Sequence, residues 1–351
     1  MFRSACPSGL DSEVGPGAGR PCDPAYGCSH GTHVAGIVAG ANGEMSGVAS
    51  QASIVAVQVF TLADAPDCGK CVTALMSDVL HGLEWVYRNR DRYNIAAVNL
   101  SPGGGRFRGY CDGDAPYTRI INLLAQANIA TVVASGNDGF AHAMAQPACV
   151  EDAIAVGATS MRDHVAPFSN STGYLDFLAP GHTESNDPKN RGILSAVPGT
   201  GFQRQSGTSM AAPHLAGAYA ILKGAVPEAT LWQMTDVLRR TGRLIQDPRN
   251  GVRTPRIQLN AAIAALRLAV ARAQPKPQPR PSRYRHRHRK IGWKNDPKSM
   301  TASASKTAGM TARARAARTR LSGRDEQFKL KKPPGTAISL AMDRASYEDT
   351  M

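Results

Sequence analysis

The stretch SGTSMAAPHLAGAYAILK, residues 206–223, decides how this chain is interpreted. The run of small residues after Ser209 predicts a helix, and Pro213 fits in its first turn, where N–H groups need no helical partner. The first N–H groups of a helix are free donors and carry a partial positive charge. Ser209 therefore has its hydroxyl beside donors that could hold an oxyanion, although a lone serine in this position is most often only a cap.

Two further stretches place polar side chains among small residues. GCSHGTHVAG (27–36) carries His30 and His33 at the predicted start of a helix. ASGND (134–138) places Asn137 directly after an apolar run. A histidine suits general-base work because its pKa lies near neutrality. The H-x-x-H spacing also fits a metal pair, but no Glu stands where a metalloprotease base is needed. Asn137 alone would also fit an ordinary turn.

The apolar pattern predicts an α/β fold with a mostly parallel sheet. Continuous apolar runs that indicate buried strands alternate with helical patterns; the strands are 52–60, 95–101, 129–136 and 153–159, and the helices 73–91 and 116–128. Strands that are apolar throughout need cover on both faces. Sites in such sheets lie beyond the carboxyl ends of the strands. The segments NLSPGGG (99–105) and ASGNDG (134–139) follow two of them.

Charge divides the chain into regions. The formal net charge is +14, yet residues 1–270 hold 21 basic and 21 acidic side chains, so the whole excess lies in residues 271–351. We expect a Cys/Gly/Pro-rich loop over 1–29, an α/β domain over 30–270 and a basic, mostly disordered tail over 271–351. RYRHRHRK (283–290) could contact nucleic acid without specificity, or it could be part of a solvated extension.

Cysteine usage favours an oxidising compartment. All seven cysteines lie within residues 1–149, which suits disulfides, with the pairing left open. Cys68 and Cys71 form a C-x-x-C, which without a second pair is weak support for zinc. The start MFRSACPSGL has no apolar run of signal-peptide length, and no stretch is long enough to span a bilayer.

Together, HGTHVAG, ASGN and GTSMAAPH resemble the signature blocks of the subtilisin-like serine proteases, over roughly residues 22–265. The resemblance implies a subtilisin-like doubly wound, mostly parallel sheet with helices on both faces. It implies a serine endopeptidase that forms an acyl-enzyme on Ser209, with His30 as general base and Asn137 in the oxyanion hole. His33 matches a structural histidine of the family.

The resemblance also indicates how substrate would bind. Ser101, Gly103 and Gly104 match the segment that pairs with the substrate backbone as an added strand, and Pro102 replaces the usual leucine. Gln146-Pro147 falls where the family has a proline, often cis, and 256–266 matches the closing helix. We expect a secreted monomer that acts on proteins or peptides and does not enter membranes. No cofactor is expected, and the sequence does not locate a structural calcium.

One expected partner is missing from the pattern. The resemblance places a triad aspartate thirty or more residues before the histidine, whereas only 29 residues precede His30. Asp11 and Asp23 lie among them, but neither follows an apolar strand or matches the family's Asp-Ser/Thr-Gly block. We therefore expect that an N-terminal part with the aspartate strand is absent from this chain. The alternative function is a peptide-binding relative with little or no catalytic activity.

Overall fold

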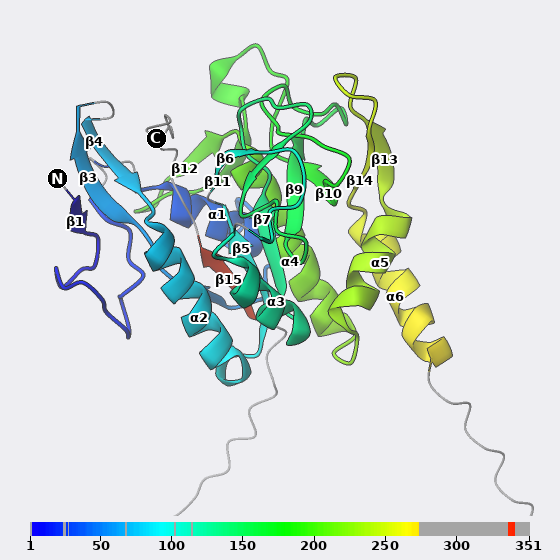
Figure 1. The fold of residues 1–351 in the computed structure, drawn as a ribbon, viewed down its shortest axis with the longest axis horizontal. Coiled ribbons are helices and arrows are strands. Elements are labelled where there is room, and N and C mark those ends of the chain that lie inside the picture. Colours follow the sequence, from blue (N-terminus) through cyan, green and yellow to red (C-terminus); the bar gives the residue numbers. More distant parts are fainter. Residues whose placement is uncertain are drawn as a thin grey trace, which may run out of the picture. The chain divides into compact units, whose positions relative to one another are not determined.

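A sheet of eight strands forms the centre of the computed structural model, in the order β13-β14-β10-β9-β7-β5-β15-β2 (Figure 1). The structure describes residues 2–23, 26, 28–66, 69–101, 103–113, 115–273 and 336–340. Residues 1–274 and 332–351 form one compact unit, to which every element named below belongs. All neighbouring strands of this sheet run parallel except β13, which is antiparallel to β14.

The strands of the central sheet are β2 (Ile54–Ala56), β5 (Ile95–Leu100), β7 (Ala130–Ala134), β9 (Ile154–Thr159), β10 (Phe177–Pro180), β13 (Arg243–Gln246), β14 (Arg253–Arg256) and β15 (Thr336–Leu340). The helices are α1 (His30–Ala39), α2 (Met76–Tyr93), α3 (Thr118–Gln126), α4 (Thr208–Ala225), α5 (Leu231–Thr241) and α6 (Leu259–Ala273), and Pro188–Asn190 forms a short 3-10 turn. Every residue of β5, β7 and β9 is buried, as expected for strands covered on both faces.

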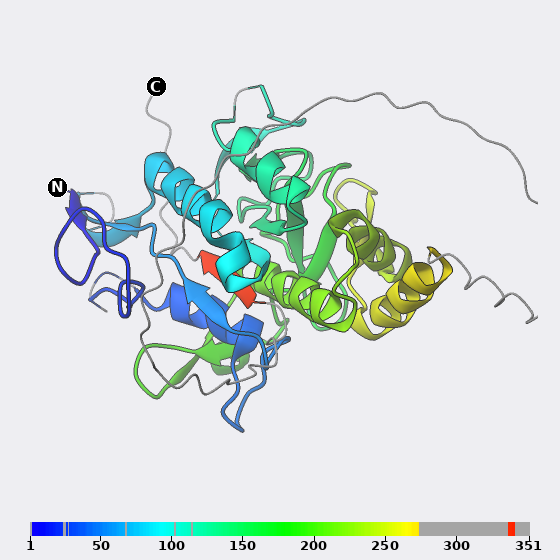
Figure 2. The same ribbon diagram turned by 90° about the horizontal axis from the view of Figure 1, so that it is seen from below.

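Helices cover both faces of the sheet (Figure 2). Successive side chains of a strand point to opposite faces of a sheet, so alternate residues of β7 contribute to different cores. Val132 belongs to the core that also contains apolar residues of α4, α5 and α6. Val133 belongs to the core formed with α2 and α3. The doubly wound α/β architecture expected from the sequence is thus confirmed.

Three small antiparallel sheets also form within the described part of the chain. Their strands are β1 (Phe2–Ser4), β3 (Thr61–Ala65) and β4 (Gly69–Thr73) in the first, β11 (Ile193–Ala196) and β12 (Phe202–Gln205) in the second, and β6 (Gly104–Phe107) and β8 (Met144–Gln146) in the third. The peptide bond between Gln146 and Pro147 is cis, as the resemblance implied. Disulfides join Cys22 to Cys28 and Cys111 to Cys149, and Cys71 is also disulfide-bonded.

The structure differs from the sequence-based prediction in segments that become strands by pairing with residues far away in the sequence. Residues 2–4, expected in a loop, form β1 because they pair with β3 about sixty residues later. Residues 336–340, expected in a disordered tail, form β15 between β5 and β2. The closing helix predicted over 256–266 is α6, which begins at Leu259 and continues to Ala273, three residues past the domain end expected near residue 270. The rest of the predicted tail, residues 274–335 and 341–351, lies outside the described residues.

The position of β15 leads to a prediction about stability. Replacing Ile338 with proline removes a backbone N–H from a strand that has a neighbour on each side. A backbone carbonyl of a neighbouring strand that loses its hydrogen-bond donor inside the sheet costs about 1–3 kcal/mol. We expect Ile338→Pro to lower the melting temperature by several degrees in a calorimetric scan, at about 2–4 °C per kcal/mol.

Ile338→Val is the matched control, since it changes the same side chain and keeps the N–H. It should melt close to the parent chain. Equal melting temperatures for the proline variant and the parent would contradict the placement of β15 inside the sheet.

Candidate active site

The residues singled out in the sequence come together where α1 and α4 begin. His30 is the first residue of α1, Ser209 the second of α4, and the two helices pack against each other. Ser101 follows the carboxyl end of β5, and Asn137 lies in the loop after β7. Parallel strands end at one edge of the sheet, so this is where an α/β sheet is expected to hold a site.

Ser209 is held by hydrogen bonds with Ser101, the residue that follows β5. Its side chain is largely buried, and its hydroxyl donates to the carbonyl oxygen of Ser101 at 3.4 Å. In return, the hydroxyl of Ser101 donates to the carbonyl oxygen of Ser209 at 3.3 Å. The side-chain amide of Asn99 donates to the same Ser101 hydroxyl at 3.1 Å. The start of α4 is therefore tied to the end of β5 by reciprocal hydrogen bonds.

Pro213 explains why the Ser209 carbonyl is available. It lies inside α4, in the second turn, and not in the first turn as the sequence pattern predicted. Because proline has no N–H, it cannot donate to the carbonyl four residues earlier, which belongs to Ser209. The Ser101 hydroxyl supplies that hydrogen bond instead. The proline is thus compatible with the helix through a partner from β5 that the sequence alone does not reveal.

Asn137 is bound to the residue just before Ser209. Its side-chain oxygen accepts hydrogen bonds from the backbone N–H and the hydroxyl of Thr208, both at 2.9 Å. Its side-chain nitrogen has no hydrogen-bond acceptor among the described residues. Since the oxygen is engaged at the start of α4, the nitrogen remains as a free donor beside Ser209. The backbone N–H of Ser209, in the first turn of α4, is a second donor at the same place.

Thr208 belongs to the candidate site, although the sequence reasoning did not single it out. It is completely buried, and its hydroxyl also accepts from the N–H of Gly136 at 3.3 Å. A threonine at the start of a helix is usually interpreted as a cap. The available signal was its position inside the GTSMAAPH block, directly before the candidate nucleophile.

His30 is a buried, neutral imidazole. Only 7% of its surface is exposed, and its Nδ1 atom is buried with no hydrogen-bond partner among the described residues. Burial, with a smaller contribution from His33, lowers the pKa of His30 to about 3. The imidazole is therefore uncharged at neutral pH, as a general base must be. Within the described residues, the Ser209 hydroxyl donates to Ser101 and not to His30.

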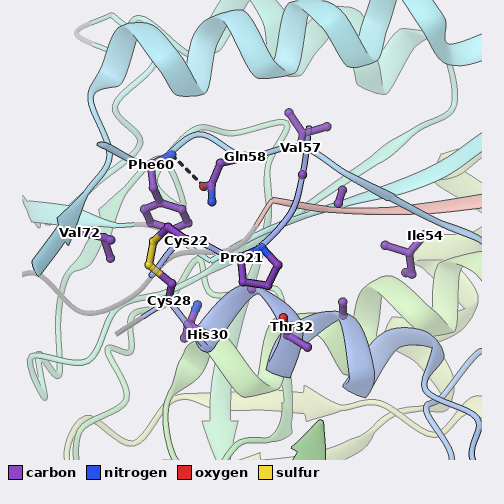
Figure 3. A pocket seen from close by; sticks show the side chains of 14 residues that line it. Pro21, Cys22, Cys28, His30, Thr32, Ile54, Val57, Gln58, Phe60 and Val72 are labelled. Atoms are coloured by element: carbon purple, nitrogen blue, oxygen red, sulfur yellow. Dashed lines mark hydrogen bonds between the residues drawn. A yellow bond between two sulfur atoms is a disulfide. The ribbon is translucent and has the colours of Figure 1, made fainter. Parts of the chain in front are cut away.

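His30 lines a mainly apolar pocket (Figure 3). Figure 3 shows His30 and Thr32 from α1 on one side and Val57, Gln58 and Phe60 from the segment after β2 on the other. The Cys22–Cys28 disulfide also lines it. No carboxylate is among the described lining residues.

The two aspartates that precede His30 are not placed to serve it. Asp11 and Asp23 are exposed, and neither lines the pocket beside His30. The structure therefore brings His30, Ser209, Asn137 and Ser101 to one edge of the sheet. Among the residues described, it brings no carboxylate to Nδ1 of His30.

His33 has a different surrounding. It is completely buried, and its Nε2 atom lies 3.1 Å from the carbonyl oxygen of Ile193 and 2.9 Å from that of Gln203. Two carbonyl partners require a proton on Nε2, so the ring donates to the β11–β12 hairpin. These contacts favour the structural role over a metal ligand. Within the part of the chain that is described, no group of three His, Cys, Asp or Glu side chains could hold a metal ion.

Ser101, Gly103 and Gly104 lie beside the site in different roles. Ser101 is buried beneath Ser209, while Gly104 begins β6, whose sheet partner is β8. A Cβ atom on Gly103 would lie 3.0 Å from that of Ala145, so the backbone runs close to β8. β6 has no described strand on its other side.

Comparison with known proteins agrees with this geometry. Residues 18–273 match the subtilase family, Peptidase_S8. Subtilisin E from Bacillus subtilis (strain 168) is 33% identical over 220 residues, which cover 61% of this chain and 51% of that protein. Subtilisin Savinase from Lederbergia lenta is 33% identical over 217 residues, which cover 61% of this chain and 70% of that protein. The chain thus spans about half the length of the first of these relatives.

Solved structures show the same similarity. A protease from Pseudoalteromonas arctica PAMC 21717 aligns with a TM-score of 0.55 and 30% identity, covering 68% of this chain and 70% of that one. The self-cleaved protease domain of PatA aligns with a TM-score of 0.55 and 26% identity, covering 75% and 91%. No described helix is long and apolar enough to cross a membrane. Because the matched span 18–273 contains the elements that carry His30, Asn137 and Ser209, we conclude that the chain belongs to the subtilase family.

Proposed function

We propose that this protein is a serine endopeptidase that hydrolyses peptide bonds through an acyl-enzyme on Ser209. The observation that carries the proposal is the pair of hydrogen bonds from Thr208 to the side-chain oxygen of Asn137. They leave one side-chain N–H donor and one helix N–H donor beside a buried serine hydroxyl. Two donors converging beside a nucleophile are what acyl transfer needs to stabilise a tetrahedral oxyanion.

His30 is the proposed general base. It takes the proton from Ser209 as the hydroxyl oxygen attacks the peptide carbonyl, then delivers that proton to the leaving amine. For this step the Ser209 hydroxyl turns from the Ser101 carbonyl toward the imidazole. The 3.4 Å distance of the Ser101 bond is long for an O–H donor, so little is lost when it breaks.

Substrate binding is proposed at β6. A peptide that adds as a strand needs an edge with free backbone groups, and β6 has a described partner only in β8. Gly103 and Gly104 let a substrate backbone approach closely because they carry no side chain. Ser101 supports the nucleophile from below rather than facing the substrate, since it is buried under Ser209.

The remaining proposals concern partners and location. The reaction needs no cofactor, because side chains and backbone supply the nucleophile, the base and the oxyanion donors. Protein or peptide substrates follow from the reaction, and we propose that the protein acts as a monomer outside the cell. The disulfides at Cys22–Cys28 and Cys111–Cys149 support an oxidising compartment. The basic stretch 283–290 lies outside the described residues.

One observation favours a second candidate, a peptide-binding relative with little turnover. Nδ1 of His30 lacks an acceptor among the described residues. A carboxylate on that atom holds the imidazole in the productive tautomer and stabilises the imidazolium that forms. Its loss costs about 3 × 10⁴ in kcat in subtilisin, a relative of this chain. The two candidates therefore differ in rate and not in the identity of the nucleophile.

Labelling with a fluorophosphonate probe tests the nucleophile. We expect the probe to label the parent chain, because it needs an activated serine and oxyanion donors but no peptide. Ser209→Ala should abolish the label. Ser206→Ala, at an exposed serine three residues earlier, is the matched control and should label like the parent. A folded parent chain that takes no label, or an Ser209→Ala variant that still does, would refute the proposal.

The pH dependence of acylation tests the state of His30. The base works only when neutral, so acylation fails below its pKa. Because burial lowers that pKa to about 3, we expect no decrease in the acylation rate from histidine protonation between pH 7 and pH 5. A decrease in the acylation rate with a midpoint near pH 6.5, the ordinary pKa of histidine, would contradict this unpaired, buried state. It would indicate a hydrogen-bond acceptor on Nδ1.

Stability must be followed across the same range. Burial also lowers the pKa values of His33 and His214, so the folded chain binds fewer protons on these three imidazoles than the unfolded chain does. The unfolded chain protonates them near pH 6.5, so stability falls as the pH drops below that value. Rates should therefore be taken as single turnovers after a rapid pH jump, with circular dichroism confirming the fold.

A further inference from the structure

Asn170 is a buried side chain that the proposed mechanism does not use. It lies in the loop between β9 and β10 and has no exposed surface. Its side-chain oxygen accepts from the N–H groups of Asp138 and Phe140, both at 3.0 Å. Its side-chain nitrogen donates to the carbonyl oxygen of Ser135 at 3.1 Å and to the carboxylate of Asp138 at 3.0 Å. All four of its hydrogen-bonding positions are therefore occupied.

The backbone of Asn170 binds the same loop. Its N–H donates to the carbonyl oxygen of Gly136 at 3.0 Å, and its carbonyl oxygen accepts from the hydroxyl of Ser135 at 2.9 Å. These partners flank Asn137: Ser135 and Gly136 precede it, and Asp138 and Phe140 follow it. A single buried residue thus determines the backbone on both sides of the candidate oxyanion donor.

Gly136 shows how closely the loop is shaped around Asn170. Its φ is +105°, a conformation that other residues rarely adopt. A Cβ atom at this position would overlap the side-chain nitrogen of Asn170. The loop therefore turns directly over the Asn170 amide, and this turn places Asn137 against Thr208.

Arg249 holds the segment that carries Asn170. It donates to the carbonyl oxygens of Pro167 at 2.9 Å and Ser169 at 2.8 Å, while pairing with the buried carboxylate of Asp247 at 2.7 Å. Burial alone would raise the pKa of Asp247, but hydrogen bonds from Arg249 keep it below the ordinary value. The N–H of Gly139 also donates to the carbonyl oxygen of Phe168 at 2.8 Å. Asn170 is therefore itself held in place.

We propose that Asn170 is a positioning residue for the oxyanion hole, which orients the Asn137 side-chain nitrogen toward the oxygen of the reacting carbonyl. This inference rests on the proposed function of Asn137. Asn170 touches neither substrate nor Ser209, so its effect on the reaction passes through Asn137. A polar network of this kind is also able to stabilise the fold alone, and the experiment separates the two roles.

The test is a double-mutant cycle on acylation by a peptide ester. Asn137→Ala should lower kcat by about 10²- to 10³-fold, the range for loss of one oxyanion donor, which comes from subtilisin. Asn170→Ala should lower kcat by about 10- to 100-fold with little change in KM, since small misplacements of catalytic groups have effects of this size. The double variant should lose no more than Asn137→Ala alone. A loss equal to the product of the two single losses would overturn the inference.

Two further variants keep the test decisive if Asn170→Ala folds poorly. Asp138→Ala, at an exposed position, removes only one partner of Asn170, and its smaller loss of kcat should also vanish in the Asn137→Ala background. Thr235→Val is the matched control for lost stability, because its hydroxyl bonds to Tyr219 and Leu231 away from the site. It should lower the melting temperature and leave kcat unchanged. An equal loss of kcat in Thr235→Val would contradict the proposed role.

A spectroscopic readout works even if the parent chain turns over slowly. The side-chain amide signals of Asn137, identified by their absence in Asn137→Ala, should shift or broaden in Asn170→Ala and stay in place in Thr235→Val. Unchanged signals in Asn170→Ala would overturn the inference. If those signals respond but Asn137→Ala leaves kcat unchanged, the positioning is correct and the proposed function of Asn137 fails.

Discussion

The geometry of the site depends on how the first turn of α4 is held. Two side chains bind it from different strands of the central sheet. Ser101, after β5, exchanges hydrogen bonds with the carbonyl and hydroxyl groups of Ser209. Asn137, after β7, accepts from the N–H and hydroxyl of Thr208. Because β5 and β7 are parallel neighbours, their ends approach α4 side by side, and the candidate nucleophile and candidate oxyanion donors keep one geometry.

The sheet that supports this arrangement is not contiguous in sequence. β15, from the last part of the chain, lies between β5 and β2 and also packs against α1 and α4. Its carboxyl end runs parallel to that of β5, where Leu340 pairs with Leu100, directly before Ser101. A strand in this position supports the helices that carry His30 and Ser209. It therefore links the far end of the sequence to the site.

Much of this could be predicted from particular residues. The apolar runs at 95–101, 129–136 and 153–159 gave three buried strands because both faces of a parallel sheet demand apolar residues. The sequence blocks around His30, Asn137 and Ser209 identified the family. Local pattern could not reveal Ser101 as the partner that compensates for Pro213, nor Asn170 as the support of Asn137. Both depend on hydrogen bonds between residues at least 30 positions apart. The short, weakly apolar run of β15 gave no signal either, since its place is created by the two strands that flank it.

The most direct test of the account is to trap the covalent intermediate. The chain is mixed with an activated peptide ester, quenched in acid, and its intact mass and digested fragments are measured. We predict that the acyl group adds once to the parent chain and maps to Ser209, and that it is absent from Ser209→Ala. A folded chain that gains no acyl mass, or an acyl group that maps to another residue, would contradict the assignment of Ser209 as the nucleophile.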